Sequence, residues 1–180
     1  MLIRHAEKPA KDGAPFGVNR KGLRSKEALA VRGWQRAGAL TSLFAPANGQ
    51  FQHPSLATPQ FLYASKPQLR KGSRRSLQTI TPLGDKLAIK INSEFQRSEF
   101  AGMIEDVFSR NGVVLISWQR EYIPDIASLI LGDSTIAPSD WPEERYDMIW
   151  VFDLNRSSST YRFKQVPQEL LAGDSITPIE

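Results

Sequence analysis

The clearest clue to the architecture of this chain is the stretch Val113-Val-Leu-Ile-Ser-Trp118, a continuous apolar run rich in β-branched residues. A run of this kind is typical of a strand that is covered on both faces of its sheet. The segment Pro124–Leu131 follows it with the pattern of a helix. A buried strand that leads into a helix indicates an α/β protein with a largely parallel sheet.

Other segments continue this alternation of strands and helices. Strands are predicted at Met1–His5, Phe61–Ser65, Met148–Leu154 and, as a hairpin edge, Ser159–Val166; helices are predicted from an N-cap at Ser25 to Phe44, at Arg75–Lys86 and at Phe100–Phe108. We therefore expect one domain over residues 1–180, a three-layer α/β/α sandwich. Residues 167–180 are polar and interrupted by proline and glycine, which predicts a loosely packed tail.

Composition narrows the possible chemistry. The chain has 180 residues, 41% of them hydrophobic, and can build a core without disulfides or metals. It has no cysteine, and its two histidines, His5 and His53, are far apart in sequence, so we expect no metal and no other cofactor. No run approaches the ~20 apolar residues of a membrane span, which predicts a cytoplasmic protein without membrane contact.

Charge is divided unevenly along the chain. Residues 1–90 carry 16 lysines and arginines against 4 acidic residues, whereas residues 91–180 carry 7 against 15. Five of the basic residues fall within ten positions, namely Lys66, Arg70, Lys71, Arg74 and Arg75. Such a cluster attracts anionic ligands, but a solvated face, or two halves that pair electrostatically, accounts for the pattern equally well.

A candidate reactive group stands at the end of the first predicted strand, in the pair Arg4-His5. Imidazole is a nitrogen nucleophile near neutral pH, and a neighbouring guanidinium suits phosphate oxygens. The other histidine, His53, lies in a polar loop and is predicted to be a surface residue. Because ligands of open α/β sheets bind at the carboxyl ends of strands, we expect Arg4-His5, Ser65 and Trp118–Arg120 to converge.

The dipeptide alone is weak evidence, but further segments in the same order make the pattern more specific. They are the opening Met1-Leu-Ile-Arg-His-Ala-Glu-Lys-Pro9, then Leu29–Ala37, Tyr63–Ser65, Arg75–Thr79, and Val113–Trp118 with Ile123-Pro124 behind it. Through them the chain, from Met1 to about Leu154, resembles the histidine phosphatase superfamily, the phosphoglycerate-mutase-like proteins. It is most similar to a bacterial branch whose opening reads Arg-His-Ala-Glu-Lys.

The resemblance implies a phosphoglycerate-mutase-like fold and phosphoryl transfer without a metal. His5 is then the nucleophile that forms a phosphohistidine, and Arg4 and Arg75 hold the equatorial phosphoryl oxygens. Substrate contacts are expected from Lys8, Ser65 and Arg74. The expected partner is a phosphorylated small molecule or the phosphate ion, and the oligomeric state is left open.

The chain departs from that branch where a second catalytic histidine is expected. The segment reads Trp118, Gln119, Arg120, so an arginine stands at the position of the histidine. Arginine can bind the same oxygens, but its pKa above about 12 prevents it from acting as an acid near neutral pH. The loss of general-acid catalysis would cost ~10²- to 10⁴-fold in rate. Three carboxylates, Glu7, Glu94 and Glu121, are candidate acids, and the sequence assigns none of them.

Three functions are compatible with these patterns. The first is a phosphomonoester hydrolase that is slow or narrow in substrate. The second is a catalytically inactive protein that binds phosphorylated ligands in a pocket containing Arg120. The third is a nucleic-acid-binding module, which ranks last because the basic cluster has no interleaved aromatic residues and no recognised binding motif.

Overall fold

A central mixed sheet organises the computed structural model, which describes residues 1–67 and 72–180. Within these residues the sheet has the strand order β3-β2-β4-β1-β5-β6. The strands are β1 (Leu2–Arg4), β2 (Phe61–Ala64), β3 (Ile91–Asn92), β4 (Val114–Trp118), β5 (Met148–Asn155) and β6 (Thr160–Pro167). The first four in the spatial order are parallel, and β5 and β6 form an antiparallel hairpin at one side.

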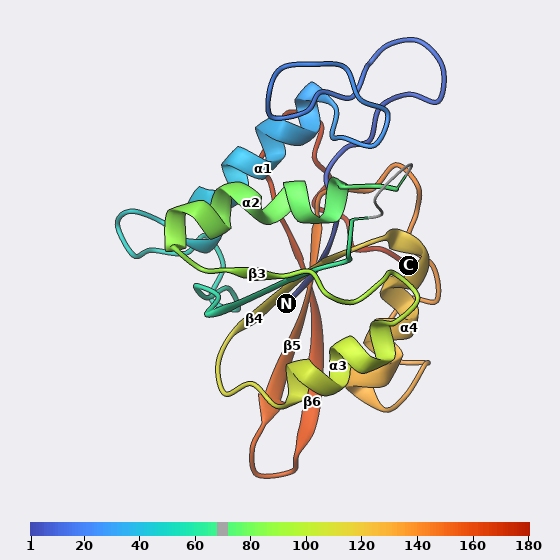
Figure 1. Ribbon diagram of the computed structural model, residues 1–180. Helices are drawn as coiled ribbons and strands as arrows, with labels where there is room; N and C mark the ends of the chain where they lie inside the picture. Colours follow the sequence, from blue (N-terminus) through green and yellow to red (C-terminus); the bar gives the residue numbers. More distant parts are fainter. Residues whose placement is uncertain (68–71) are drawn as a thin grey trace.

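Helices cover both faces of the sheet, which completes three layers. Figure 1 shows α1 (Val31–Phe44) and α2 (Arg75–Leu87) on one face, and α3 (Phe100–Phe108) and α4 (Ile123–Leu131) on the other. A short 3₁₀ turn, Arg120–Tyr122, connects β4 to α4. Each helix turns an apolar stripe toward the sheet, as their sequence periodicity predicts. Apart from the beginning of α1, the predicted strands and helices are confirmed within a few residues at their ends, and the short strand β3 was not predicted.

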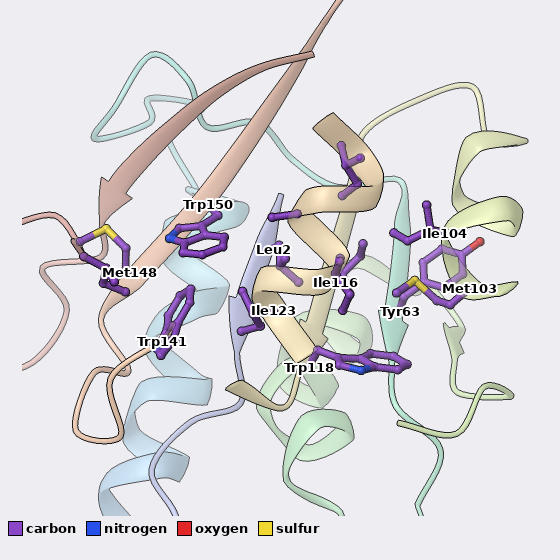
Figure 2. Packing of buried hydrophobic residues seen from close by; sticks show 14 residues of the cluster. Leu2, Tyr63, Met103, Ile104, Ile116, Trp118, Ile123, Trp141, Met148 and Trp150 are labelled. Atoms are coloured by element: carbon purple, nitrogen blue, oxygen red, sulfur yellow. The ribbon is translucent and has the colours of Figure 1, made fainter. Parts of the chain in front are cut away.

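Two apolar cores separate the sheet from its helices. The one under α3 and α4 contains three tryptophans, Trp118, Trp141 and Trp150, with no exposed surface. In Figure 2, Trp141 lies against Trp150, with ring centroids 5.1 Å apart, and Trp118 stands at the end of β4. Aromatic side chains of this size contribute much of the burial energy of a core. The buried Trp118 side chain therefore fixes the end of β4, and with it the position of Gln119 and Arg120, which follow.

The beginning of α1 differs from the sequence prediction. The helix starts at Val31, and its N-cap is Ala30 rather than Ser25, with no side-chain cap. Ser25 instead donates its N–H to the carbonyl of Gly17, in a loop that folds back on itself before the helix. The helix then packs closely on the segment after β1, because a Cβ at Gly33 would lie 2.6 Å from the Glu7 carbonyl oxygen. The absence of a side chain at Gly33 brings the two segments together.

The last residues are packed and do not form the loose tail that was predicted. Gln168 and Ile179 are buried. The carboxylate of Asp174 accepts hydrogen bonds from the Arg36 guanidinium at 2.7 and 3.0 Å, and Arg36 also binds Glu7. These buried polar contacts between distant segments fix the path of residues 167–180, although that segment contains proline and glycine. Composition alone does not reveal such contacts.

Candidate active site

The carboxyl ends of β1, β2 and β4 meet at one edge of the sheet, beside a small cavity of about 120 Å³. Four predicted site residues line it, namely Arg4, His5, Lys8 and Arg75. Lys66, Ser73, Arg97, Gln119 and Glu121 complete the lining. The volume lies below the ~300 Å³ at which sites for larger organic ligands begin. It suits a small charged group.

His5 is held rigidly at the end of β1. Its backbone N–H donates to the Trp118 carbonyl at 2.9 Å, and its imidazole Nδ1 lies 2.8 Å from the carbonyl oxygen of Ala6. A carbonyl can only accept, so Nδ1 carries the hydrogen and Nε2 keeps its lone pair. The Nε2 atom has no protein partner among the described residues. This tautomer is the one that a nitrogen nucleophile requires.

The pKa of His5 is lowered to about 3, so the imidazole is neutral at physiological pH. Burial is the largest cause, because desolvation disfavours the charged form. The contact with the Ala6 carbonyl acts in the opposite direction, and the charges of Arg4, Arg75 and Lys8 lower the pKa further. Burial and the cationic neighbours therefore act in the same direction, and both lower the pKa of His5.

Arg4 is fixed by a loop that precedes β5. Its Nη1 atom donates to the carbonyls of Pro142 at 3.1 Å, Glu143, and Arg145 at 2.8 Å. The ring of Tyr146 lies against the guanidinium, 3.9 Å from its central carbon. The Nε atom is buried and has no hydrogen-bond partner in the described part of the chain. One side of the guanidinium thus anchors it, and the other has a free donor.

Arg75 presents a second free donor from the first turn of α2. Its Nη1 atom donates to the Lys26 carbonyl at 3.2 Å, and its Nε atom is buried without a partner in residues 1–67 and 72–180. Burial lowers the pKa of both Arg4 and Arg75, although arginine keeps its charge in proteins. The neighbouring Arg74 is exposed and does not line the cavity. Arg70 and Lys71 of the basic cluster lie outside the described residues.

The side chain of Arg120 is bonded to the loop at Trp141 and does not line the cavity. Its Nη1 atom donates to the Trp141 carbonyl at 3.1 Å, and the side chain lies 3.8 Å from Glu121 and 3.9 Å from Asp140. It is not part of the cavity lining, whereas its neighbours Gln119 and Glu121 are. Arg120 therefore does not line the cavity with Arg4, His5 and Arg75, although it lies close enough to Arg4 for its charge to lower the pKa of that guanidinium.

Ser65 lies behind the cavity and supports Gln119. The Gln119 amide nitrogen donates to the Ser65 hydroxyl at 2.7 Å, and the Gln119 carbonyl oxygen is buried without a partner in the described segments. The reversed amide orientation fits the same contact, because a hydroxyl can donate as well as accept. That orientation turns the Gln119 NH₂ group toward the cavity, where an anion can accept from it.

Sequence reasoning assigned no role to four residues of the lining, and it named Glu121 only as one of three candidate acids. Gln119 and Glu121 flank Arg120, and the comparison with a histidine motif drew attention to Arg120 and not to these two neighbours, which line the cavity. Lys66 lies two positions after the end of β2, and its place after a parallel strand was a usable signal. Arg97 comes from the loop before α3, and Ser73 from the loop before α2, and nothing in the sequence marks them.

The described residues contain no group of three or more histidine, cysteine or acidic side chains that could hold a metal ion. None of the helices in this part of the chain is both long and apolar enough to cross a bilayer. What the lining does offer is guanidinium and ammonium donors around a neutral imidazole. That set can hold a tetrahedral oxyanion and place a nitrogen lone pair beside it.

Comparison with known proteins supports the architecture. No protein-family model and no curated protein matches the chain. Among solved structures, the chain is similar to a mycobacterial glucosyl-3-phosphoglycerate phosphatase in complex with VO3, a member of the histidine phosphatase superfamily. The TM-score is 0.51 at 10% sequence identity, and the match covers 91% of this chain and 95% of the other. The chain therefore has the phosphoglycerate-mutase-like α/β/α fold that its sequence predicts.

Proposed function

We propose that this protein is a phosphomonoester hydrolase in which His5 accepts the phosphoryl group. The observation that carries the proposal is the pair of buried, unpartnered Nε–H groups of Arg4 and Arg75, which belong to two residues of the cavity that contains His5. A buried donor without a partner is costly, about 1 to 3 kcal/mol, and calls for an explanation. An oxyanion bound between the two guanidinium groups supplies one.

The chemistry follows from the tautomer of His5. The lone pair of Nε2 attacks phosphorus in line, a P–N bond forms, and the P–O bond to the leaving alcohol breaks. Arg4 and Arg75 stabilise the negative charge on the equatorial oxygens. Water then attacks the phosphohistidine, the P–N bond breaks, and inorganic phosphate and the neutral imidazole are restored. The low pKa of His5 leaves the Nε2 lone pair free of a proton before the attack and again after the P–N bond breaks.

The leaving oxygen needs a proton, and Glu121 is best placed to supply it. It is the carboxylate in the described lining of the cavity. Glu7 is engaged by Arg36, and Glu94 is exposed and outside the lining. We assign the role of general acid to Glu121 and no proton transfer to Arg120, which is bonded to Trp141. Phenolate leaving groups, which need little protonation, are expected to react faster than alkoxides.

Two measurements test the proposal together. Turnover of p-nitrophenyl phosphate is expected, and rapid quenching should trap a phosphoenzyme that peptide mapping places on His5 and not on His53. Inorganic phosphate at ~100 times its dissociation constant should stabilise the fold by about 2.7 kcal/mol at constant ionic strength. A melting temperature that millimolar phosphate does not move would refute the phosphate site itself.

The same measurements separate the hydrolase from the second function, an inactive protein that binds phosphorylated ligands. Stabilisation by phosphate without turnover and without a trapped phosphoenzyme would favour that function. The position of Arg120 is what makes the inactive protein a serious alternative. This arginine stands where the related branch has its second histidine, and it is bonded to Trp141 and does not line the cavity.

A further inference from the structure

The loop that holds Arg4 is itself held by hydrogen bonds that centre on Arg145 and Asp147. The Arg145 carbonyl accepts from Arg4 Nη1 and from the Trp141 indole N–H, each at 2.8 Å. The Arg145 side chain donates through Nε to Asp147 Oδ1 at 2.7 Å. The two side chains are 15% and 8% exposed, so water and salt screen this ion pair little.

Both residues also contact the last segment of the chain, residues 167–180, which we call the C-terminal strap. Arg145 Nη2 donates to the Thr177 carbonyl at 2.8 Å. Asp147 Oδ2 accepts the Ser175 N–H at 2.6 Å. The two oxygens of this carboxylate therefore have different partners, one in the loop that holds Arg4 and one in the strap. Each of the two side chains joins the loop to the strap.

A second set of contacts joins the strap to the segment that follows His5. Asp174 of the strap pairs with Arg36 at 2.7 Å, and Arg36 pairs with Glu7 at 2.9 Å. Glu7 lies two positions after His5. The strap thus reaches the surroundings of both Arg4 and His5, by separate contacts, although the described lining of the cavity contains no residue of the strap.

We propose that Asp147 and Arg145 are positioning residues, which transmit the docking of the C-terminal strap to the Arg4 guanidinium. The described lining of the cavity contains neither of them, so they reach the site through the loop whose carbonyls orient Arg4. A small displacement of a positioned group is enough to lower a rate by up to ~10²-fold. The inference rests on the proposed function, because it takes Arg4 as a ligand of the phosphate.

Asp147→Asn tests the inference, because it separates positioning from charge. The change removes a negative charge near an anion site, and charge alone predicts tighter phosphate binding. It also turns an amide NH₂ group toward an N–H of Arg145 or of Ser175, so one of the two contacts is lost. Positioning predicts the opposite sign. The dissociation constant of inorganic phosphate, measured by calorimetry at constant ionic strength, should rise ~10-fold, and kcat/KM for p-nitrophenyl phosphate should fall by ~10- to 10²-fold.

The chain offers a matched control in Asp106→Asn. Asp106 accepts from Arg110 at the same distance, 2.7 Å, and the described lining of the cavity includes neither residue. The control removes an equal charge from an equivalent ion pair that has no contact with the loop that holds Arg4. Phosphate affinity in Asp106→Asn should stay within ~2-fold of the wild-type value, because distant sites act independently.

Arg145→Lys is a second variant, and it keeps the charge of the arginine. An ammonium group cannot reproduce the geometry with which the guanidinium binds Asp147 and Thr177 together. Positioning therefore predicts a ~3-fold weaker phosphate affinity, whereas charge alone predicts no change. This variant decides the matter if Asp147→Asn does not fold.

Hydrogen exchange measured by mass spectrometry gives a result that needs no ligand. Peptides from residues 141–147 and 167–180 should exchange faster in Asp147→Asn than in the wild type, because the contacts between the loop and the strap are weakened. The same peptides should keep their wild-type exchange in Asp106→Asn.

The outcomes separate the two proposals. If the wild type binds phosphate and both Asp147→Asn and Arg145→Lys bind it as tightly or more tightly, the positioning role is wrong and the proposed function stands. Faster exchange of the loop with unchanged phosphate affinity would make the two residues structural only, which also overturns the inference. If the wild type does not bind phosphate at all, the proposed function fails and the positioning role fails with it.

Discussion

The two walls of the cavity are built on different principles. On the inner wall, Arg4 and His5 are almost fully buried, 2% and 5% exposed, and their side chains are held by hydrogen bonds to backbone carbonyls. On the outer wall, Lys66 and Arg97 are exposed, and only their backbones are held. In the proposed hydrolase, a prearranged inner wall would suit a reaction that is the same for every substrate, and the more adaptable outer side chains would suit contacts that differ between substrates.

The largest effect is expected from the nucleophile on the inner wall. His5→Ala should lower turnover of p-nitrophenyl phosphate by on the order of 10⁴-fold or more, because the proposed phosphoryl intermediate forms on its Nε2 atom. Phosphate binding should persist, since Arg4 and Arg75 remain. The control is His53→Ala, in a loop away from the cavity, which should match the wild-type rate. Residual turnover near the wild-type level in His5→Ala would move the chemistry to another residue.

Next in size is the loss of a guanidinium donor. Arg75→Lys keeps the charge but removes the buried Nε–H, and it should lower kcat/KM by ~10²- to 10³-fold, as the loss of one preorganised donor does elsewhere. The adjacent Arg74→Lys makes a sharp comparison, because the Arg74 side chain is exposed and outside the lining. Steady-state kinetics of both variants decide whether the phosphate contact belongs to residue 75, residue 74 or both.

The free energy of unfolding should fall in mild acid because His5 is buried in its neutral form. The pKa of His5 is about 3 in the folded protein and 6.5 in the unfolded chain, so the unfolded state binds the proton first as the pH falls. Above pH 6.5 the neutral His5 costs the folded protein no stability. Between pH 6.5 and 3 the free energy of unfolding falls, because the unfolded chain takes up the proton and the folded protein does not. At pH 5 the loss is about 2 kcal/mol.

Denaturant titrations at pH 7 and pH 5 measure this effect. The His5→Gln variant should lose about 2 kcal/mol less than the wild type between the two pH values, because other titrating groups contribute equally to both proteins. Equal losses would mean that the imidazole reaches solvent and takes up its proton in the folded state.

The smallest effect is expected at Arg120, behind the inner wall. The resemblance to a two-histidine site suggests that Arg120→His would raise turnover. The geometry predicts a different result, because the Arg120 guanidinium donates to Trp141, next to the loop whose carbonyls hold Arg4. Loss of that bond costs about 1 kcal/mol and should weaken phosphate binding by ~5-fold, with partial recovery in Arg120→Lys. Faster turnover in Arg120→His would return this position to the catalytic site.

Much of the fold could be predicted because its elements carry their own periodicity. The run from Val113 to Trp118 and the apolar spacing in Phe100–Phe108 report burial locally, and both elements formed as expected. The path of residues 167–180 could not be predicted, because it depends on the pairing of Asp174 with Arg36, 138 positions away. Polar contacts between distant residues leave no local pattern.

The candidate site divides in the same way. Arg4 and His5 are adjacent in the chain and end a strand, so sequence reasoning selected them. The three carbonyls that orient Arg4 come from residues 138 to 141 positions away, and backbone groups have no sequence signature. For Arg120, a motif position gave the right place along the chain, but it could not show that the side chain turns toward Trp141.

The hydrogen bond from the His5 N–H to the Trp118 carbonyl has a consequence for the lifetime of the site. It joins the carboxyl ends of β1 and β4, the two central strands of the sheet, and its opening requires these strands to separate at that end. Protons bonded between central strands exchange with solvent through larger and rarer openings than protons in exposed loops, which exchange through brief local openings. The backbone of the inner wall therefore opens rarely, whereas the exposed side chains of the outer wall can move on a shorter timescale while the inner wall stays in place.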